Sequence, residues 1–387
     1  MAKKNIAVLD FGSNHISVLI GDRGINGTFD VRGFAKSSYA GFLDGEILEP
    51  EKLSAVLCQT ITSAESNARA KITHLYIGVP AEFSIAEVRT CELEFDRKKR
   101  VTDREIEQAF SKADEFGSSP THIVINRSPI CYELDNSERV IDPRGRTTSK
   151  LLATLSFVLC ERNFVGTVSQ AIHDLHIPFV EFISEVLAET MYLIEPEQRD
   201  QCSILVDCGY LTTSVAVIVG DGLVHLRSFA LGGGQLTADL AEMLEAPFEV
   251  AEILKQNIAL TGRPSENEKM VVNYNGNEYQ FDTLAVYEIT MRKIKQIAKM
   301  IAKSLETCEY ERPDFIPVNL TGGGISFIKG VCESMREVLN KDVRIIRPEV
   351  SQMAEPDNSA ILGLLDLALR QNHANYSFFI KIFKKQF

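Results

Sequence analysis

The chain has 387 residues, of which 45% are hydrophobic and 24% are charged, a composition typical of a globular protein of two or three domains and not of a disordered one. The formal net charge of −12 excludes a general nucleic-acid binder, because phosphate neutralisation needs a basic face. No apolar stretch approaches the roughly 20 residues of a membrane span, and the N-terminus lacks the apolar core of a signal peptide.

The N-terminal region predicts a mixed α/β lobe. Residues 5–10 and 15–21 are short β-rich runs joined by a polar turn, and 28–37 can form a third strand. Residues 50–70 carry apolar side chains at helical spacing, and 74–80 is a strand that ends at a proline. The order β-β-β-α-β is typical of a mixed α/β fold.

Residues 81–175 predict a small α+β module inserted into this lobe. Alternating apolar and polar residues at 90–95 indicate a half-buried strand. Thr102 and Glu105 have the spacing of a capping box and open an amphipathic helix. Two further strands and a second helix, over 163–177, complete the module.

The second half of the chain repeats the beginning. "AVLDFGSNHISVLIG" at 7–21 and "ILVDCGYLTTSVAVIVG" at 204–220 are each a strand, Asp-x-Gly, a polar turn and a strand. We interpret this as an internal duplication of an α/β lobe. Around and after the second copy we expect, in chain order, helix 184–194, strand–glycine turn–helix 225–244, an Asn275-Gly276 hairpin, helix 283–308, strand–glycine turn–helix 316–335 and helix 358–370.

The glycine-rich turns suggest a phosphate site. Glycine lets backbone N–H groups point together at an anion, and Ser13 and Thr212 can add hydroxyl donors. The Asp beside each turn suits Mg²⁺. A third turn, 322–324, stands at a predicted strand-to-helix joint, where a base or ribose could approach the backbone and a helix N-terminus favours phosphate. Two such turns facing each other predict two lobes around one nucleotide cleft.

This arrangement resembles the actin, Hsp70 and hexokinase superfamily, and within it the chain resembles the FtsA family of bacterial cell-division proteins over nearly its whole length. The motifs that carry the resemblance are "SEVLAETMYLI", "LVDCGYLTTSVAVI", "AVYEITMRKIKQI" and "NLTGGGISFIKGV", together with the inserted module and the amphipathic end. The resemblance implies these divisions: a first-lobe subdomain at 1–75 and 169–198, the inserted subdomain at 76–168, a second-lobe subdomain at 199–228 and 313–357, a smaller one at 229–312, a helix returning to the first lobe at 358–371, and a linker with a membrane helix at 372–387.

The resemblance also implies site residues for ATP and Mg²⁺. The first phosphate turn is Asp10, Gly12, Ser13, Asn14 and His15; the second is Asp207, Gly209, Thr212 and Thr213; the adenosine side is Gly322, Gly323, Gly324, Ile325, Glu252 and Lys255. Asp10 and Asp207 would hold the metal. Glu185 could orient an attacking water, or could equally be a solvated helix residue.

The second turn departs from the family pattern. The family writes Gly-Gly-Gly-Thr-Thr-Asp, whereas this chain has Gly209-Tyr210-Leu211-Thr212-Thr213-Ser214. Two glycines have gained side chains, so fewer positive-φ conformations are available, and the last carboxylate is replaced by a hydroxyl. We expect ATP binding with slow or absent turnover, so that the protein is at most a slow ATPase.

Residues 376–387, "YSFFIKIFKKQF", predict an amphipathic helix that lies in a membrane interface, although a helix docked on the protein itself is the alternative. The apolar and the basic residues fall on opposite faces at about 100° per residue. The residues expected to act at the membrane, through the apolar face or through the charge of the lysines, are Phe378, Phe379, Lys381, Ile382, Phe383, Lys384, Lys385 and Phe387. Because twelve residues bind weakly alone, anchoring needs several copies.

The expected function is therefore an ATP-binding, actin-like, polymerising scaffold on the cytoplasmic face of the cell membrane at the division site. The resemblance implies as partners the FtsZ C-terminal peptide, anionic lipid, other copies of the chain and other division proteins, but no nucleic acid. Four cations on helix 283–308 would suit an acidic peptide or form a solvated face: Arg292, Lys293, Lys295 and Lys299. Alternatives are an exopolyphosphatase or guanosine-pentaphosphate phosphatase, which "DFGSN" also resembles, and a pilus-assembly actin homologue.

Overall fold

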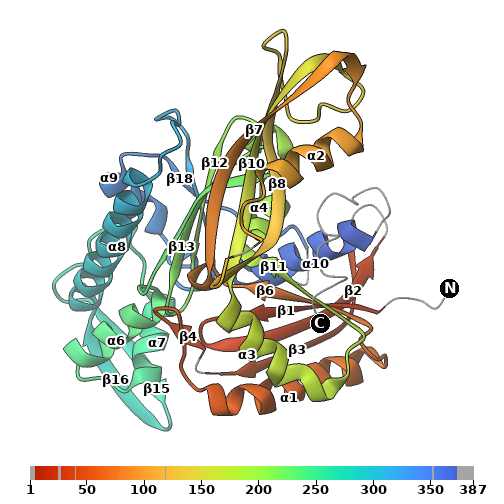
Figure 1. The fold of residues 1–387 in the computed structure, drawn as a ribbon. Helices are drawn as coiled ribbons and strands as arrows, with labels where there is room; N and C mark the ends of the chain where they lie inside the picture. The colour runs from red at the N-terminus through yellow and green to blue at the C-terminus, as the bar shows by residue number, and fades with distance from the viewer. Residues whose placement is uncertain (1–4, 25–27, 40, 118, 351–352, 373–387) are drawn as a thin grey trace.

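The computed structural model describes residues 5–24, 28–39, 41–117, 119–350 and 353–372. Two lobes, each built on a five-stranded sheet, lie side by side, and a smaller four-stranded module stands on the first lobe (Figure 1). No helix in these ranges is long and apolar enough to cross a membrane.

The first-lobe sheet is covered by helices on both faces. Helices α1 (Pro50–Ala68) and α3 (Arg162–Ile172) pack on one face, and α4 (Glu185–Leu193) and α10 (Ser359–Asn372) on the other. The strand order is β11-β6-β1-β2-β3, with bounds Phe179–Ser184, His74–Val79, Ile6–Phe11, His15–Arg23 and Phe29–Ser38. A two-stranded ribbon of β4 (Phe42–Leu43) and β5 (Glu46–Ile47) follows β3.

The second-lobe sheet repeats the first. Its order is β14-β13-β12-β17-β18, with bounds Gly222–Phe229, Thr213–Val219, Ser203–Cys208, Val318–Thr321 and Val343–Ile345. Each sheet is an antiparallel three-strand meander continued by two parallel strands. Asp10 pairs with Ser17 across the first hairpin and Asp207 with Ser214 across the second. The duplication extends from the motif to the whole sheet.

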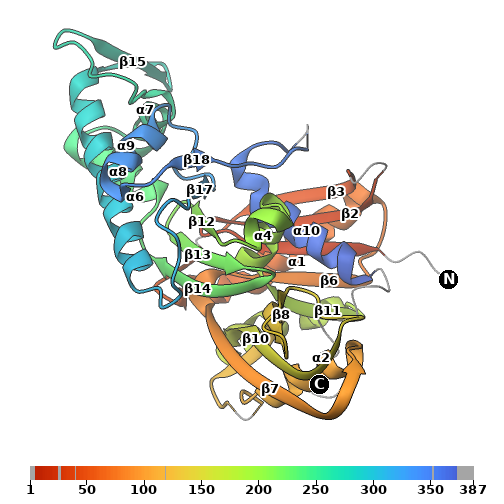
Figure 2. The ribbon, with the colours of Figure 1, turned by 90° about the horizontal axis from the view of Figure 1, so that it is seen from above.

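The smaller part of the second lobe is mainly helical and lies at its outer end, with α8 and α9 on the outside (Figure 2). Its long helix α8 contacts α6 and α9. The bounds are α6 Gly233–Met243, α7 Phe248–Asn257, β15 Lys269–Tyr274, β16 Asn277–Asp282, α8 Thr283–Glu306 and α9 Val331–Leu339. Asn275 and Gly276, both at positive φ, form the predicted hairpin turn.

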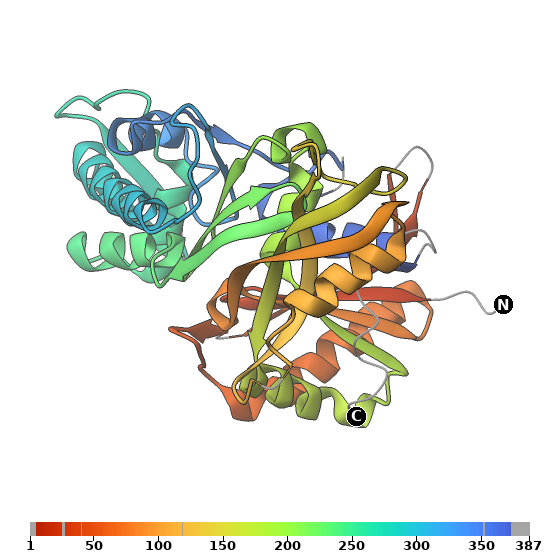
Figure 3. The same cartoon turned by 45° about the horizontal axis from the view of Figure 1, so that its top comes forward.

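The inserted module has its own hydrophobic core and also touches the second lobe. Its sheet runs β7-β10-β8-β9, with α2 packed on it, and the bounds are β7 Ser84–Arg100, α2 Asp103–Ala113, β8 His122–Leu134, β9 Arg139–Val140 and β10 Thr147–Glu161. The base of the module meets the β13–β14 hairpin (Figure 3). There Ser156 Oγ donates to the Leu223 carbonyl at 2.7 Å. The module sheet begins at Ser84, and β6 pairs with β1 and β11 in the first-lobe sheet, where the strand at 74–80 was expected.

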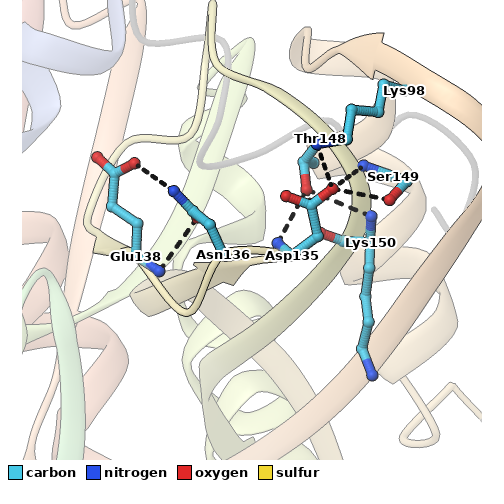
Figure 4. A network of polar contacts seen from close by, with 7 residues as sticks. All are labelled: Lys98, Asp135, Asn136, Glu138, Thr148, Ser149 and Lys150. Atoms are coloured by element: carbon cyan, nitrogen blue, oxygen red, sulfur yellow. Dashed lines mark hydrogen bonds and ion pairs between the residues drawn. The ribbon is translucent and has the colours of Figure 1, made fainter.

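Side-chain contacts fix the register at the outer end of this module (Figure 4). The β7–β10 ladder shifts between Thr148 and Lys150. There Asp135 accepts from the backbone and the hydroxyl of Ser149 (3.0 and 2.7 Å), and Lys98 lies 3.4 Å from the same carboxylate. Asn136 and Glu138 bond to each other across the adjoining turn. The capping box at Thr102 and Glu105 is confirmed at the start of α2.

The third glycine-rich turn, at 322–324, differs from its expected structure. Gly322–Gly324 was expected at a strand-to-helix joint, but α9 begins only at Val331. The intervening residues form turns and a bridge in which Leu260 donates to the Lys329 carbonyl. The glycines therefore offer no helix N-terminus to a phosphate. Gly322 is needed for another reason: its φ is +88°, and a Cβ there would lie 2.0 Å from an Asp207 carboxylate oxygen.

We predict that Asp366 on α10 fixes this helix to the first sheet. Its carboxylate, 3% exposed, lies 2.6 Å from both Arg23 on β2 and Arg370 on α10. Asp366→Ala leaves two guanidinium groups without this partner and should lower the free energy of unfolding by about 1–3 kcal/mol, measured in urea. Glu333→Ala, which breaks an exposed pair with Arg336, should cost less than about 1 kcal/mol. Equal losses in the two variants would contradict the prediction.

Candidate functional site

A cavity of about 340 Å³ lies where the two lobes meet, and both Asp-x-Gly turns line it. Gly12 belongs to the β1–β2 turn and Gly209 to the β12–β13 turn. The predicted residues that open on this cavity are Asp10, Gly12, Ser13, Asn14, His15, Glu185, Asp207, Gly209, Thr212, Gly322 and Gly323. Segments almost 200 positions apart in the sequence thus share one site.

A hydrogen bond joins the two turns directly. The backbone N–H of Leu211 donates to Ser13 Oγ at 3.0 Å. Ser13 is buried, with 7% of its surface exposed. Gly41, at a φ of +70°, packs so closely that a Cβ there would lie 2.1 Å from the Ser13 carbonyl oxygen. The Asn14 carbonyl accepts from Tyr39 N–H (3.2 Å). The first turn is therefore held by the first lobe while its serine contacts the second.

Six acids line the cavity, and four of them come from two strand ends and one helix. Asp10 and Asp207 come from the ends of β1 and β12, and Glu185 and Glu189 come from successive turns of α4. Glu185 is 8% exposed and Glu189 only 1%, and an Oε2 atom of each has no hydrogen-bond partner. Sequence reasoning missed Glu189. The available signal was its spacing: an acid four residues after Glu185 in an otherwise apolar helix lies on the same face.

The carboxylates hold protons unusually well. Burial, and then the Asp207 charge, raise the pKa of Asp10 from 3.8 to about 7. Burial raises the pKa of Asp207 to about 6. Burial and the charges of Asp10 and Asp207 raise the pKa values of Glu185 and Glu189 well above the ordinary range. Near neutral pH, the cluster therefore binds protons or needs a cation.

Little positive charge opposes this cluster. Of the described residues that line the cavity, Lys36 on β3 is the single lysine or arginine, and its Nζ lies 3.9 Å from Asp357, another lining acid. His15 lies 3.9 Å from Asp10, but burial and Lys36 lower its pKa to about 4, so it is neutral at pH 7. Sequence reasoning missed Lys36, which lies in a strand whose sequence gives no sign of the cleft.

The acidic half of the cavity fits a hydrated divalent cation. The partnerless buried oxygens in the cavity belong to Glu185 and Glu189, beside Asp10 and Asp207. Carboxylate oxygens are the donors that Mg²⁺ prefers, but Mg²⁺ usually keeps several waters and takes only one or two carboxylates. In the described part of the chain, no group of three or more His, Cys, Asp or Glu side chains could by itself hold a metal ion. Asp10 and Asp207 would therefore hold the ion through its waters.

Four of the predicted adenosine-side residues, Gly324, Ile325, Glu252 and Lys255, do not line the cavity, and neither does Thr213 of the second phosphate turn. Thr213 is fully buried and donates to the Leu231 carbonyl (2.6 Å). Lys255, 1% exposed, pairs with Glu252 at 2.7 Å, and Ile325 is in the core. A Cβ on Gly324 would lie 2.1 Å from the Gly209 carbonyl oxygen. These five residues are therefore engaged by contacts within the second lobe.

The four cations proposed for an acidic peptide do not form one surface. Lys293 is buried and pairs with Asp239 at 2.8 Å. Lys295 lies 3.1 Å from Glu337, and Arg292 contacts the Met243 sulfur. Arg292 and Lys299, seven residues apart and exposed, lie on the same face of α8. The membrane-facing residues proposed at 378–387 lie outside the described residues.

The duplicated sheets, the shared cavity and the paired Asp-x-Gly turns define the class of actin-like ATPase folds. Solved structures of other proteins have a similar fold. The PilM–PilN type IV pilus biogenesis complex matches with a TM-score of 0.62 at 15% identity, covering 94% of this chain and 98% of that one. MreB5 of Spiroplasma citri bound to ADP matches with a TM-score of 0.56 at 12% identity, covering 96% and 99%. The predicted fold is confirmed.

Within this class the chain is similar to FtsA cell division proteins. The family model described as "Cell division protein FtsA" matches residues 204–363. FtsA of Pseudomonas aeruginosa is 23% identical over 378 residues, 95% of this chain and 90% of that protein. FtsA of Enterococcus hirae is 24% identical over 376 residues, 95% and 84% of the two chains. The predicted resemblance is confirmed along nearly the whole sequence.

We predict that the carboxylate cluster makes stability depend on pH. The folded pKa of Asp10, about 7, exceeds its ordinary 3.8, so between these values the folded protein holds a proton that the unfolded chain has lost. The stability contributed is present at low pH and is lost as pH rises through this window, by at most about 1.4 kcal/mol per pH unit for each such group. Asp10→Asn should flatten this slope in urea unfolding between pH 5 and about 8.

The control for this measurement is Asp96→Asn, which changes an exposed aspartate on β7 and should keep the wild-type slope. Mg²⁺ added above pH 7 should raise the melting temperature of the wild type more than that of Asp10→Asn, because a cation that binds only the folded state stabilises it. An unchanged slope in Asp10→Asn would show that this carboxylate is already ionised in the folded protein.

Proposed function

We propose that this protein is an actin-like scaffold of cell division that attaches the division ring to the cytoplasmic face of the cell membrane. The similarity to FtsA proteins over 95% of the chain carries the proposal. It is supported by an inserted module in the first lobe and by two related turns that meet in one cavity. Catalysis is not needed for this role.

The C-terminal segment is the proposed membrane contact. After Asp366 the sequence has no acid, while Arg370 and three lysines give a local charge of +4 in a chain of −12. Aromatic and aliphatic residues alternate with those lysines at helical spacing. Each lysine near an anionic surface contributes about 1 kcal/mol, so several copies in a filament would bind a membrane firmly where one copy would not.

Head-to-tail assembly and the FtsZ C-terminal peptide complete the proposal. A heterologous contact between copies gives an open filament, which is what multivalent membrane binding requires. Arg292 and Lys299 are the exposed cations of α8 that could receive an acidic peptide, and the buried Lys293 is not available to it. In the cleft, we propose a hydrated Mg²⁺ beside Asp10 and Asp207; ATP is the ligand that the family resemblance implies.

The alternatives have less support. The likeness to the PilM–PilN complex, at 15% identity, concerns the fold, whereas the curated relatives that match over most of the sequence are division proteins. A polyphosphatase of this fold would need an acid in the second turn, where this chain has Tyr210, Leu211 and Ser214. Release of phosphate from polyphosphate by the purified protein would favour that alternative.

We predict that deleting 374–387 leaves a folded protein that no longer pellets with vesicles of anionic phosphatidylglycerol. Phe383→Asp should act like the deletion, because it places a charge on the apolar face. Gln386→Ala is the matched control and should pellet like the wild type. Circular dichroism checks that each variant is folded. Pelleting of the deletion variant at the wild-type level would disprove the membrane assignment.

We also predict that the double variant Arg292→Glu, Lys299→Glu lowers the affinity for a synthetic FtsZ C-terminal peptide about tenfold or more, because like charges then face an acidic ligand. Fluorescence anisotropy of the labelled peptide measures this. Lys112→Glu, an exposed change on α2 in the inserted module, has the same kind of charge reversal and should leave the affinity unchanged. Equal loss in both proteins would indicate a general charge effect and no peptide site on α8.

A further inference from the structure

The second phosphate turn is bonded to the helix that follows it. The carbonyl of Gly209 accepts from Gly233 N–H at 3.0 Å, and the carbonyl of Tyr210 accepts from Gly234 N–H at 2.6 Å. Gln235 Nε2 donates to the Leu211 carbonyl at 3.0 Å. The first N–H groups of a helix have no partners within it and are available to bind anions. At the start of α6 they are used by the turn itself.

The Tyr210 ring fills the space beside these bonds. A Cβ on Gly234 would lie 2.8 Å from the ring, so the ring rests on the helix backbone. Lys255 Nζ lies 5.5 Å from the ring centroid, within cation–π range, and 5.9 Å from that of Phe327. Tyr210 also lines the cavity. It therefore lies between the acidic cavity and the buried Lys255, which pairs with the half-buried Glu252.

Three glycine-containing segments also pack against one another beside Tyr210: the second phosphate turn at Gly209, the start of α6 at Gly233 and the turn at Gly324. A Cβ on Gly233 would lie 2.2 Å from the Gly324 carbonyl oxygen, and Gly324 is equally close to Gly209. Gly324 N–H donates to the Cys208 carbonyl at 2.8 Å. A flat base needs about 3.5 Å to the atoms on each of its faces, hence about 7 Å between two walls. Turns in direct backbone contact leave no such gap.

We propose that Tyr210 is a plug in the second lobe: the cleft accepts a cation and a phosphate group beside Asp10 and Asp207, and excludes the base and ribose of a nucleotide. The glycine that the family resemblance implies at this position has no side chain with which to fill that space. The inference rests on the packing of the second lobe and not on the proposed membrane role. A scaffold of this kind would assemble without a nucleotide.

The test compares ATP with inorganic tripolyphosphate, which has the phosphates and no nucleoside, by calorimetry on the full chain with Mg²⁺. The wild type should bind ATP no more tightly than tripolyphosphate. Tyr210→Gly should gain about tenfold or more in ATP affinity relative to tripolyphosphate, because it opens the nucleoside space. Tyr210→Phe keeps the ring, loses only the hydroxyl and should behave like the wild type.

Two results would overturn the proposal. One is a wild-type preference for ATP over tripolyphosphate of about tenfold or more, since the nucleoside would then be bound despite Tyr210. The other is a Tyr210→Gly protein that is folded by circular dichroism and gains nothing over Tyr210→Phe. If Tyr210→Gly does not fold, melting temperatures of the wild type decide: a larger increase with ATP than with tripolyphosphate contradicts the plug. Lipid pelleting is a separate readout, so failure here leaves the membrane role intact.

Discussion

The cleft depends on a concentration of like charge that the fold must hold together. Two strands from different lobes end at the same point, and α4 adds two glutamates between them. Carboxylates this close and this buried cannot all ionise without an opposing charge, because desolvation and mutual repulsion both favour the protonated form. Protons or a cation therefore belong to the folded state of the cleft.

The two Asp-x-Gly turns make different contacts in the cleft. The first copy keeps a serine whose hydroxyl crosses to the other lobe, and its neighbours are polar. In the second copy the carbonyls of Gly209 and Tyr210 are bonded to α6, and the aromatic ring covers the helix start. The less faithful copy has thus exchanged ligand-binding groups for internal packing, which explains why its glycines could be replaced without loss of the sheet.

The sequence predicted the parts of the fold that depend on local periodicity. The β-β-β-α-β order, the duplicated hairpins, the Asn275-Gly276 turn and the long helix α8 all follow from alternation, helical spacing or turn residues. What depends on tertiary packing could not be predicted. Lys36 enters the cavity from a strand whose sequence gives no sign of the cleft, whereas the four-residue spacing to Glu185 was a signal for Glu189. The packing around Tyr210 depends on how three distant segments meet, and the six-residue gap between Gly324 and α9 has no simple local signal.

The inserted module sets the relation between the lobes independently of the cleft. Asn126 on β8 accepts from Ser184 N–H at the start of α4 (2.7 Å), while the Pro129 carbonyl in the same strand accepts from Asp221 N–H in the second lobe (3.1 Å). One strand of the module therefore contacts both lobes within a few residues. A cleft that binds no nucleoside cannot set the lobe angle through a base held between its walls. In that case the brace formed by β8 fixes the angle, and copies of the chain can present the same assembly surface whatever the nucleotide supply.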